Sequence, residues 1–438
     1  MTTGELVVEH DPKELMDSVF SSIDRIQAIL GEKYKNIANA GLATQRSSIV
    51  CWNKVTGEHY SPVISWQDRR TVSEITQFEH LSYRIHQLTG LYINPHYGAT
   101  KMRWCLDELK NDKLAVPVSL CIAPLASFVM FNLLSGKPYL VDPANASRTL
   151  LMNYKSLTWD AELLNIFSID EKNLPKLVTT RHCFGNIMRH GHSIPLSICT
   201  GDQSAAIYSR GALANDEIFV NAGTGAFILK SSDTLPLLRE EKLLASVVYA
   251  DENKSDYVIE GTVNGAGRAL QWMAEESGIN EYETLLERWC REFIDPPVFL
   301  NAISGIGSPY WVASAQSSFS REASDPEKFV AVLESIVFLI AENIACIRRL
   351  CTGISHITLA GGLSTNPVVC QLLANITGLD VVRLEEQEAT SLGVFHLLKN
   401  DGFQRTDSDS ATFNPLSDQM VVNRYHQWQE MMSQRFLS

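Results

Sequence analysis

The chain has 438 residues, of which 45% are hydrophobic and 20% charged, and its formal net charge at pH 7 is -13. This length is enough for two large domains. The net negative charge opposes non-specific binding to nucleic acid and to anionic membranes, because both are polyanions. The nine cysteines include no C-x-x-C pair, so we expect neither a disulfide framework nor a zinc site, and reduced thiols in a cytoplasmic protein.

No targeting segment or membrane span is expected. The first residues form neither a basic region nor an apolar one, as a signal peptide would require. The two most apolar stretches are residues 119–135, interrupted by Pro124, and residues 329–347, which contain Glu334 and Glu342. Neither offers the roughly 20 uninterrupted apolar residues that a span needs, so both are predicted to be core helices.

Helical and extended segments alternate along the chain, which favours an α/β fold over separate helical and sheet regions. Asp11 and Pro12 form an N-cap with a first-turn proline, and they predict a helix that runs to about Leu30. Residues 37–52 are predicted to be extended, and residues 63–66 form a second predicted strand.

The middle of the chain contains two predicted turns that matter below. Residues 194–199 form a predicted strand that stops at Thr200 and Gly201, after which Asp202 begins a helix that runs to about Arg210. A second strand, residues 218–220, enters the turn Gly223-Thr224-Gly225 and leaves as residues 227–229, which indicates a hairpin with bare backbone at its tip.

A third strand-turn-helix unit lies near the C-terminus. Residues 357–359 lead into Gly361 and Gly362, and Asn366 with Pro367 caps the following helix. Residues 400–415 are rich in Asp, Ser and Thr and are predicted to be a linker to a C-terminal helix.

Each candidate functional motif also has an ordinary structural interpretation. An aspartate such as Asp202 at a strand-to-helix turn is more often an N-cap than a catalyst, although a helix N-terminus also stabilises a carboxylate that must accept a proton. The turn at Gly223-Thr224-Gly225 serves a hairpin equally well whether or not its N–H groups wrap a phosphate. Gly361 and Gly362 form either a packing turn or a surface that a flat ligand approaches closely.

Three histidines lie close together in sequence, at positions 182, 190 and 192. No carboxylate stands at ligand spacing beside them, so we interpret them as loop or surface residues and not as a metal site. Taken singly, Gln45 and Arg46 are typical of a solvated or ion-paired surface, and Trp66 is typical of a core.

The order and spacing of these features together resemble the FGGY carbohydrate kinases, and most of all their glycerol kinase-like branch, over nearly the whole chain. The matching blocks are Glu9-His10-Asp11-Pro12, Gln45-Arg46, Trp66-Gln67-Asp68-Arg69-Arg70, Lys101-Met102-Arg103-Trp104, Asn145-Ala146-Ser147-Arg148-Thr149, Gly201-Asp202-Gln203, Gly223-Thr224-Gly225-Ala226-Phe227, Glu260-Gly261, Gln271-Trp272, Ser308-Pro309-Tyr310-Trp311, Gly361-Gly362 with Asn366, and Glu388-Ala389-Thr390-Ser391-Leu392-Gly393.

The resemblance implies two ribonuclease H-like (actin-like ATPase) domains of α/β type around a central cleft. Residues 1–210 would be the N-terminal domain, which binds a polyol or sugar, and residues 211–438 the C-terminal domain, which binds the nucleotide. The implied activity is ATP-dependent phosphorylation of a hydroxyl group. Asp202 would be the catalytic base and would also help to hold Mg²⁺, directly or through water, and the habit of the family favours a homodimer.

The resemblance also assigns residues to the two ligands. The acceptor site would contain Arg46, Trp66, His96, Gln203 and Phe227. The ATP site would contain Gly223, Thr224, Gly225, Gly267, Gln271, Gly361, Gly362 and Asn366.

Two departures concern the acceptor. Glycerol kinases follow Gln-Arg with a glutamate that binds a substrate hydroxyl, where this chain has Ser47, and they have a substrate-binding tyrosine where it has His96. Because a site that lacks hydrogen-bonding partners discriminates strongly against the corresponding ligand, we expect a polyol or ketose larger than glycerol.

A third departure concerns the phosphates. The family opens with a hairpin carrying Asp-x-Gly-Thr-Thr, and this sequence begins downstream of that position. From the sequence as given we therefore expect an open sheet edge and weak catalysis with nucleotide binding retained. The alternative is a catalytically impaired regulatory protein that binds sugar or nucleotide. An actin- or chaperone-like ATPase without sugar chemistry is disfavoured, because Gln45, Arg46, Trp66 and Asp202 match the polyol side of the kinase pattern.

Overall fold

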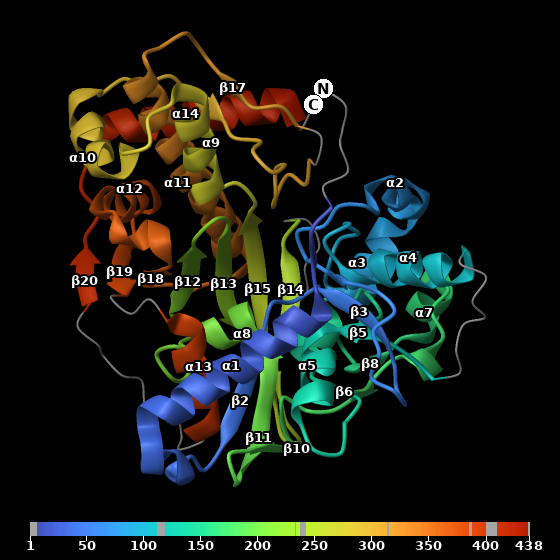
Figure 1. Ribbon diagram of the computed structural model, residues 1–438. Coiled ribbons are helices and arrows are strands. Elements are labelled where there is room, and N and C mark those ends of the chain that lie inside the picture. The colour runs from blue at the N-terminus through green and yellow to red at the C-terminus, as the bar shows by residue number, and fades with distance from the viewer. Residues whose placement is uncertain are drawn as a thin grey trace.

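The computed structural model describes residues 7–111, 119–232, 234–236, 242–312, 315–384, 388–399 and 410–436. The chain forms two α/β halves, and their sheets divide between Gly201 and Glu217. Figure 1 shows the first half, coloured blue to green, beside and below the second half, whose colours run from green through yellow to red.

The first half contains two main sheets and two short strand pairs. The sheet in the order β1-β4-β3-β5 consists of β1 (Glu9–His10), β4 (Val63–Ile64), β3 (Ile49–Asn53) and β5 (Leu120–Pro124). The sheet in the order β10-β11-β2 consists of β10 (Arg181–Arg189), β11 (His192–Gly201) and β2 (Ala40–Thr44). The short pairs join β6 (Leu140–Val141) to β9 (Lys176–Leu177) and β7 (Met152–Asn153) to β8 (Thr158–Trp159).

The helices of the first half cover these sheets. They are α1 (Pro12–Leu30), η1 (Gly31–Asn36), α2 (Val72–Ile75), η2 (Thr76–Leu81), α3 (Ser82–Thr89), α4 (Gly98–Asn111), α5 (Leu125–Leu133), α6 (Pro143–Ser147), α7 (Ala161–Phe167), η3 (Glu171–Asn173) and α8 (Asp202–Ala206).

The first predicted helix has the predicted bounds. The Asp11 carboxylate accepts hydrogen bonds from the backbone N–H groups of Lys13 and Glu14, at 2.7 and 3.0 Å. The α-helix ends before Gly31, whose φ of 54° departs from the α-helical conformation, and the 3-10 helix η1 follows. The helix predicted from Asp202 to about Arg210 is shorter than expected, because α8 ends at Ala206 and is followed by turns.

The second half is built on one seven-stranded sheet in the order β14-β15-β13-β12-β18-β19-β20. Its strands are β14 (Leu244–Ala250), β15 (Ser255–Val263), β13 (Ala226–Ser232), β12 (Glu217–Ala222), β18 (His356–Ala360), β19 (Asp380–Leu384) and β20 (Ser410–Phe413). The predicted hairpin is present, because β12 pairs antiparallel with β13 and Ala222 lies opposite Ala226. A short separate pair joins β16 (Phe299–Leu300) to β17 (Ser318–Phe319).

The helices of the second half are α9 (Gly267–Ser277), α10 (Tyr282–Glu292), α11 (Asp325–Leu350), η4 (Gly362–Thr365), α12 (Pro367–Thr377), α13 (Ala389–Lys399) and α14 (Gln419–Phe436). The predicted core helix at residues 329–347 is confirmed as part of α11, which is also the one described helix long and apolar enough to cross a bilayer. Since 89% of its apolar window is buried inside the protein, α11 serves as the central core helix of this half.

Two predicted segments are wrong. Residues 119–135 contain the strand β5 followed by the helix α5, because a buried strand and a buried helix share the same continuous apolar pattern. The predicted linker at 400–415 lies partly outside the described residues, and its described part contains β20, which pairs antiparallel with β19 at the sheet edge.

Helix α13 joins the two halves. It packs against α8 and against β2, and a Cβ atom on Gly393 would lie only 1.8 Å from the Ala205 carbonyl oxygen. Within the described residues β2 and β10 are the edge strands of their sheet, and the open edge expected from the sequence stays a prediction.

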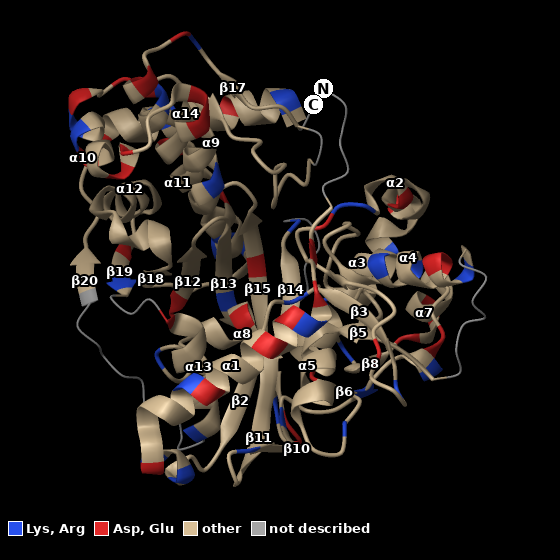
Figure 2. Ribbon diagram, viewed as in Figure 1, with Lys and Arg blue, Asp and Glu red and all other residues tan. Residues whose placement is uncertain are grey.

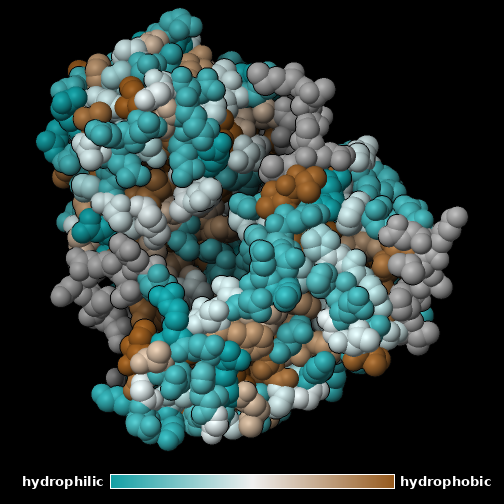
Figure 3. Space-filling model, in the orientation of Figure 1, coloured by the Kyte–Doolittle hydropathy of each residue, from teal (hydrophilic) through white to brown (hydrophobic). Residues whose placement is uncertain are grey.

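Lys and Arg are interspersed among Asp and Glu along the elements of both halves (Figure 2). Figure 3 shows a hollow on this face between the two halves, and hydrophilic residues form much of its visible wall.

Candidate active site between the two halves

Two cavities meet at the tip of the β12–β13 hairpin. The larger has a volume of about 950 Å³ and lies within the second half. The smaller, of about 350 Å³, is lined by residues of both halves. Thr224 lines both cavities, so this residue stands at the boundary between them.

The larger cavity has bare backbone just beyond the ends of the adjacent strands β12 and β18. A Cβ atom at Gly223 or Gly362 would meet nothing within 4 Å, so these glycines face open space. The N-terminus of α9 is fixed against the hairpin, because the N–H groups of Gly267 and Arg268 donate to the carbonyl oxygens of Gly223 and Thr224, at 2.9 and 3.1 Å. The hairpin tip therefore stands at the N-terminus of α9, and the positive end of the helix dipole favours an anion such as phosphate there.

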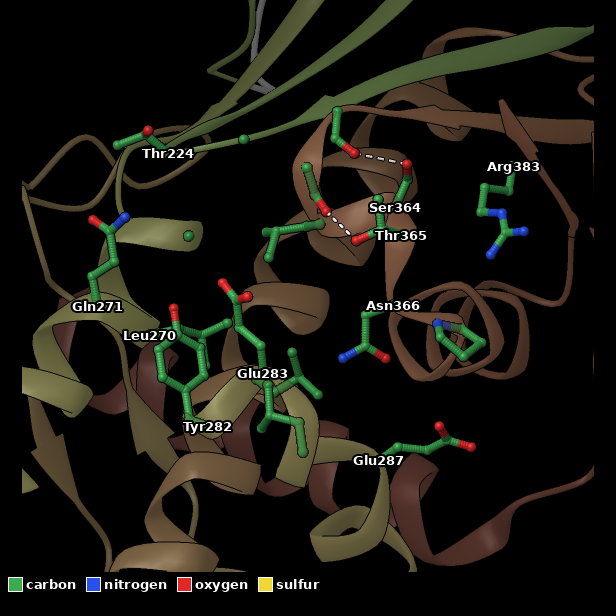
Figure 4. Close-up of a pocket in the computed structure, with 18 of the residues that line it drawn as sticks. Thr224, Leu270, Gln271, Tyr282, Glu283, Glu287, Ser364, Thr365, Asn366 and Arg383 are labelled. Atoms are coloured by element: carbon green, nitrogen blue, oxygen red, sulfur yellow. Dashed lines mark hydrogen bonds between the residues drawn. The ribbon is translucent and has the colours of Figure 1, made fainter. Parts of the chain in front are cut away.

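Side chains complete the larger cavity, as Figure 4 shows. Thr224 and Gln271 lie on one side, Asn366 lies on the other, and the carboxylate of Glu283 points toward the space between them. Asn366 also caps α12 through its side-chain oxygen, which accepts from the Val368 N–H at 2.9 Å. A cavity of this volume, lined by glycine backbone at the hairpin tip and by the amide side chains of Gln271 and Asn366, fits a nucleotide.

Asp202 faces the smaller cavity from the first residue of α8. Its side chain is 38% exposed, and the nearest cation is the Nε of Arg46 at 3.8 Å. The neighbouring Gln203 accepts a hydrogen bond from the Asn221 amide at 2.9 Å, which ties α8 to the end of β12. The carboxylate is therefore held close to the β12–β13 hairpin while it remains open to a ligand.

A buried ion pair between the two halves forms part of the lining of the smaller cavity. Arg148, which follows α6, donates to Glu260 of β15, and Ser246 of β14 contacts both side chains at 2.8 and 3.1 Å. Burial raises the pKa of Glu260, but Arg148 and Arg46 outweigh burial and hold it below the usual value. Burial, followed by the repulsion of Arg148, lowers the pKa of Arg46 to about 10.

Lys101 binds backbone carbonyl groups at and next to residues that line the smaller cavity. Its side chain is fully buried, and its ammonium group donates to the carbonyl oxygens of Ser47, Ser65 and His96, at 3.3, 2.8 and 2.8 Å. Three donors thus meet three acceptors. Burial lowers the pKa of Lys101 to about 7.

The structure brings the predicted acceptor residues together. Arg46, Trp66, His96, Gln203 and Phe227 all line the smaller cavity. The predicted nucleotide residues line the larger one, with the single exception of Gly225, which lines the smaller. The roles assigned to these residues, and the domain boundary near residue 210, stay predictions.

Several cavity residues were missed as functional candidates. The smaller cavity also contains Asn94, Tyr97, Arg69, Arg148, Glu260 and Arg268, and the larger contains Tyr282, Glu283, Glu287 and Arg383. The sequence blocks that match the family include Arg69, Arg148 and Glu260. Their place in these blocks could have identified them as candidates. No local pattern marks Glu283 or Arg383.

Few side chains of the protein are placed to bind a metal ion. Within the described ranges no group of three or more His, Cys, Asp or Glu side chains could hold a metal ion. His190 instead contacts Asp24 at 2.6 Å, and His192 contacts the Ile37 carbonyl at 2.9 Å. Since Mg²⁺ at phosphate-transfer sites is usually bound by one or two carboxylates together with the phosphates, the single carboxylate of Asp202 fits that role.

The fold and the paired cavities define the class of the protein. Two α/β domains around a cleft form the actin-like ATPase fold of carbohydrate kinases. Residues 1–209 match the N-terminal domain, and residues 218–398 the C-terminal domain, of the FGGY family of carbohydrate kinases. The chain belongs to this family, and it is a phosphotransferase with a hydroxyl acceptor.

Relatives and solved structures agree with this assignment. The chain is 31% identical over 402 residues to a glycerol kinase of Streptococcus pneumoniae, covering 89% of this chain and 80% of that one. It is 30% identical over 397 residues to a glycerol kinase of Rippkaea orientalis, covering 88% and 79%. The structure of Plasmodium falciparum glycerol kinase with ADP matches with a TM-score of 0.84 at 24% identity, covering 99% of this chain and 90% of that one. A gluconate kinase from Lactobacillus acidophilus matches with a TM-score of 0.84 at 21% identity, covering 100% and 93%.

Proposed function

We propose that this protein transfers the terminal phosphoryl group of ATP to a hydroxyl group of a small polyol or sugar. The observation that carries the proposal is the position of Thr224, which lines both cavities. ATP in the larger cavity would present its phosphates at Gly223 and Thr224. The acceptor in the smaller cavity would lie between that turn and Asp202.

Asp202 is the proposed base. It would take the proton from the attacking hydroxyl, which is the role that a positioned carboxylate plays in phosphoryl transfer. The backbone at the hairpin tip and the start of α9 would hold the phosphates in line with that hydroxyl. Bound Mg²⁺ would supply neutralisation of phosphate charge, and Asp202 is the described residue placed to contact it.

The acceptor site supports a molecule larger than glycerol. Ser47 is almost fully buried, its hydroxyl oxygen has no hydrogen-bond partner within the described structure, and it does not line the smaller cavity. Ser47 therefore offers the acceptor no hydroxyl partner there. His96 lines the cavity and can pair with one hydroxyl. The volume of about 350 Å³ lies in the range typical of small-molecule sites.

The test is a screen of ADP release across C3 to C7 polyols and ketoses, run in parallel with the Asp202→Asn variant. We expect turnover with an acceptor larger than glycerol and loss of that turnover in the variant. A clear preference for glycerol would contradict the acceptor assignment, and unchanged turnover in Asp202→Asn would contradict the role of Asp202.

A binding protein without turnover is the second candidate. It is favoured by the altered acceptor positions, because Ser47 and His96 stand where the glycerol-binding pattern has a glutamate and a tyrosine. Calorimetry separates the two candidates, because a binding protein would take up ATP and acceptor without releasing ADP.

A further inference from the structure

The first turn of α9 stands, like Thr224, at the boundary between the two cavities. Gly267, the first residue of α9, lines the larger cavity, and Arg268, the second, lines the smaller one. The N–H of Arg268 donates to the Thr224 carbonyl at 3.1 Å, and a Cβ atom on Gly267 would lie only 2.7 Å from the Gly223 carbonyl oxygen. The backbone therefore fixes an arginine directly beside the hairpin tip.

Three other arginines line the smaller cavity. Arg46, Arg69 and Arg148 stand in the first half and in sequence blocks that match the family, whereas Arg268 stands in the second half and outside those blocks. The resemblance therefore assigns no role to Arg268, and a role has to be inferred from its position.

Arg268 is well placed for phosphates bound at the hairpin tip. Among the described residues that line the larger cavity, the one cationic side chain is that of Arg383. Figure 4 shows Arg383 on the opposite side of this cavity from Thr224. On the second half, the cation beside the hairpin tip is thus Arg268 and not the arginine inside the larger cavity.

The ion pair that Arg268 forms in this structure is exposed. Two guanidinium nitrogens donate to the carboxylate of Glu275 at 2.6 and 3.1 Å, and the two side chains are 39% and 60% exposed. Exposed ion pairs contribute little to stability, because water solvates both charges, and exposed side chains change rotamer rapidly. A rotamer change alone can therefore transfer the guanidinium from Glu275 to a more negative partner.

The place of Arg268 within α9 also favours an anionic partner. A cation in the first turn of a helix is repelled by the positive end of the helix dipole, and the first turn of α9 contains no acidic residue that would offset this. A local rule broken beside a cavity is typical of a functional site. A phosphate at the hairpin tip would turn the repulsion into attraction, since it is drawn to both the guanidinium and the helix end.

We propose that Arg268 is a catalytic residue that binds the phosphoryl group during its transfer. The inference rests on the proposed function, which puts the phosphates of ATP at Gly223 and Thr224. The acceptor oxygen bonds to the terminal phosphorus while the bond from that phosphorus to the bridging oxygen of ADP breaks, and Asp202 takes the hydroxyl proton. The guanidinium leaves Glu275 and donates to the non-bridging oxygens of the transferred group, whose negative charge it offsets in the transition state.

The experiment compares two variants that break the same ion pair, Arg268→Gln and Glu275→Gln. Glu275 lines neither cavity, so Glu275→Gln is the matched control, and urea unfolding checks that both variants are folded. ADP release is measured with the acceptor that gives the highest turnover in the screen above. Arg268→Gln should lower kcat by about 10²- to 10³-fold, the usual loss for one group that stabilises transition-state charge. Glu275→Gln should stay within about 3-fold of the wild type, since it removes only an exposed ion pair.

Calorimetry measures the contact without turnover. The two probes are ADP and the β,γ-imido analogue of ATP, which keeps the terminal phosphoryl group. Arg268→Gln should weaken binding of the analogue by about 10- to 100-fold and binding of ADP by less than about 3-fold, because ADP lacks the group that the guanidinium contacts.

Equal losses of turnover in the two variants would overturn the inference, because the ion pair and not the arginine would then be required. Unchanged turnover in Arg268→Gln would overturn it as well. An equal loss of affinity for ADP and for the analogue would assign Arg268 to phosphates that are not transferred. If the wild type releases no ADP with any acceptor, the proposed function fails, whereas the phosphate contact of Arg268 fails only if Arg268→Gln binds the analogue as tightly as the wild type does.

Discussion

Replacement of Lys101 by methionine tests whether its ammonium group positions the residues that line the smaller cavity. The three carbonyl groups that Lys101 binds belong to Ser47, Ser65 and His96. The first two are chain neighbours of Arg46 and Trp66. Loss of the ammonium group should let these residues relax, so the KM for the acceptor should rise while the KM for ATP stays near that of the wild type.

The same substitution should also change how the free energy of unfolding depends on pH. Burial lowers the pKa of Lys101 to about 7 in the folded protein, whereas an unfolded lysine titrates near 10.4. Between these values the unfolded state binds more protons, so this residue makes the free energy of unfolding rise with pH by up to about 1.4 kcal/mol per unit. Lys101→Met removes that rise, and between pH 7.5 and 9 the wild type should gain about 2 kcal/mol over the variant.

Urea unfolding at those two pH values measures the effect, with Lys230→Met as the control. Lys230 is also buried, at 4% exposure, and it donates to the Ser231 carbonyl in β13, away from both cavities. The nearby charges Asp68, Arg69 and Arg70 stay the same in Lys101→Met. A stability difference from the wild type that does not change with pH, together with an unchanged acceptor KM, would refute the reasoning.

Two further predictions concern stability, one through packing and one through a buried ion pair. Gly393→Ala should lower the free energy of unfolding by about 1–3 kcal/mol and also reduce turnover, because its Cβ atom would displace α8 at Ala205; a wild-type melting temperature and turnover would contradict this. Arg424→Met should cost about 3–5 kcal/mol by leaving the buried carboxylate of Glu334 unpaired, since Arg424 binds both its oxygens at 2.5 and 2.9 Å. Addition of Glu334→Gln should recover part of that loss in urea unfolding, and no recovery would show that the ion pair is not the cause.

The local parts of the site could be predicted because their signals lie within a few residues. The N-cap at Asp11, the hairpin tip at Thr224 and the cap at Asn366 each combine a turn residue with its adjacent strand or helix. The family resemblance then placed distant residues in one site. Arg46 and Phe227 are 181 positions apart in the sequence, yet they line the same cavity.

Contacts between distant segments could not be predicted. The pair Arg148–Glu260 joins residues 112 positions apart, and the contact from Arg69 to Ser304 spans 235 positions. No period or turn signal encodes such pairs. β5 was predicted to be helical because a continuous apolar run fits both structures, and β20 was missed because its polar composition resembles a loop, although β19 supplies its pairing partner.

The most direct test of the account is a paired measurement on the wild type and Asp202→Asn. Nucleotide affinity is measured by calorimetry, and turnover is measured against the best acceptor. Asp202 lines the smaller cavity and not the larger one, so we predict unchanged affinity for ADP and a loss of turnover of about 10²- to 10⁴-fold, the usual contribution of a general base. Near-normal turnover in the variant would contradict the assignment of Asp202 as the base and, with it, the proposed arrangement of the site.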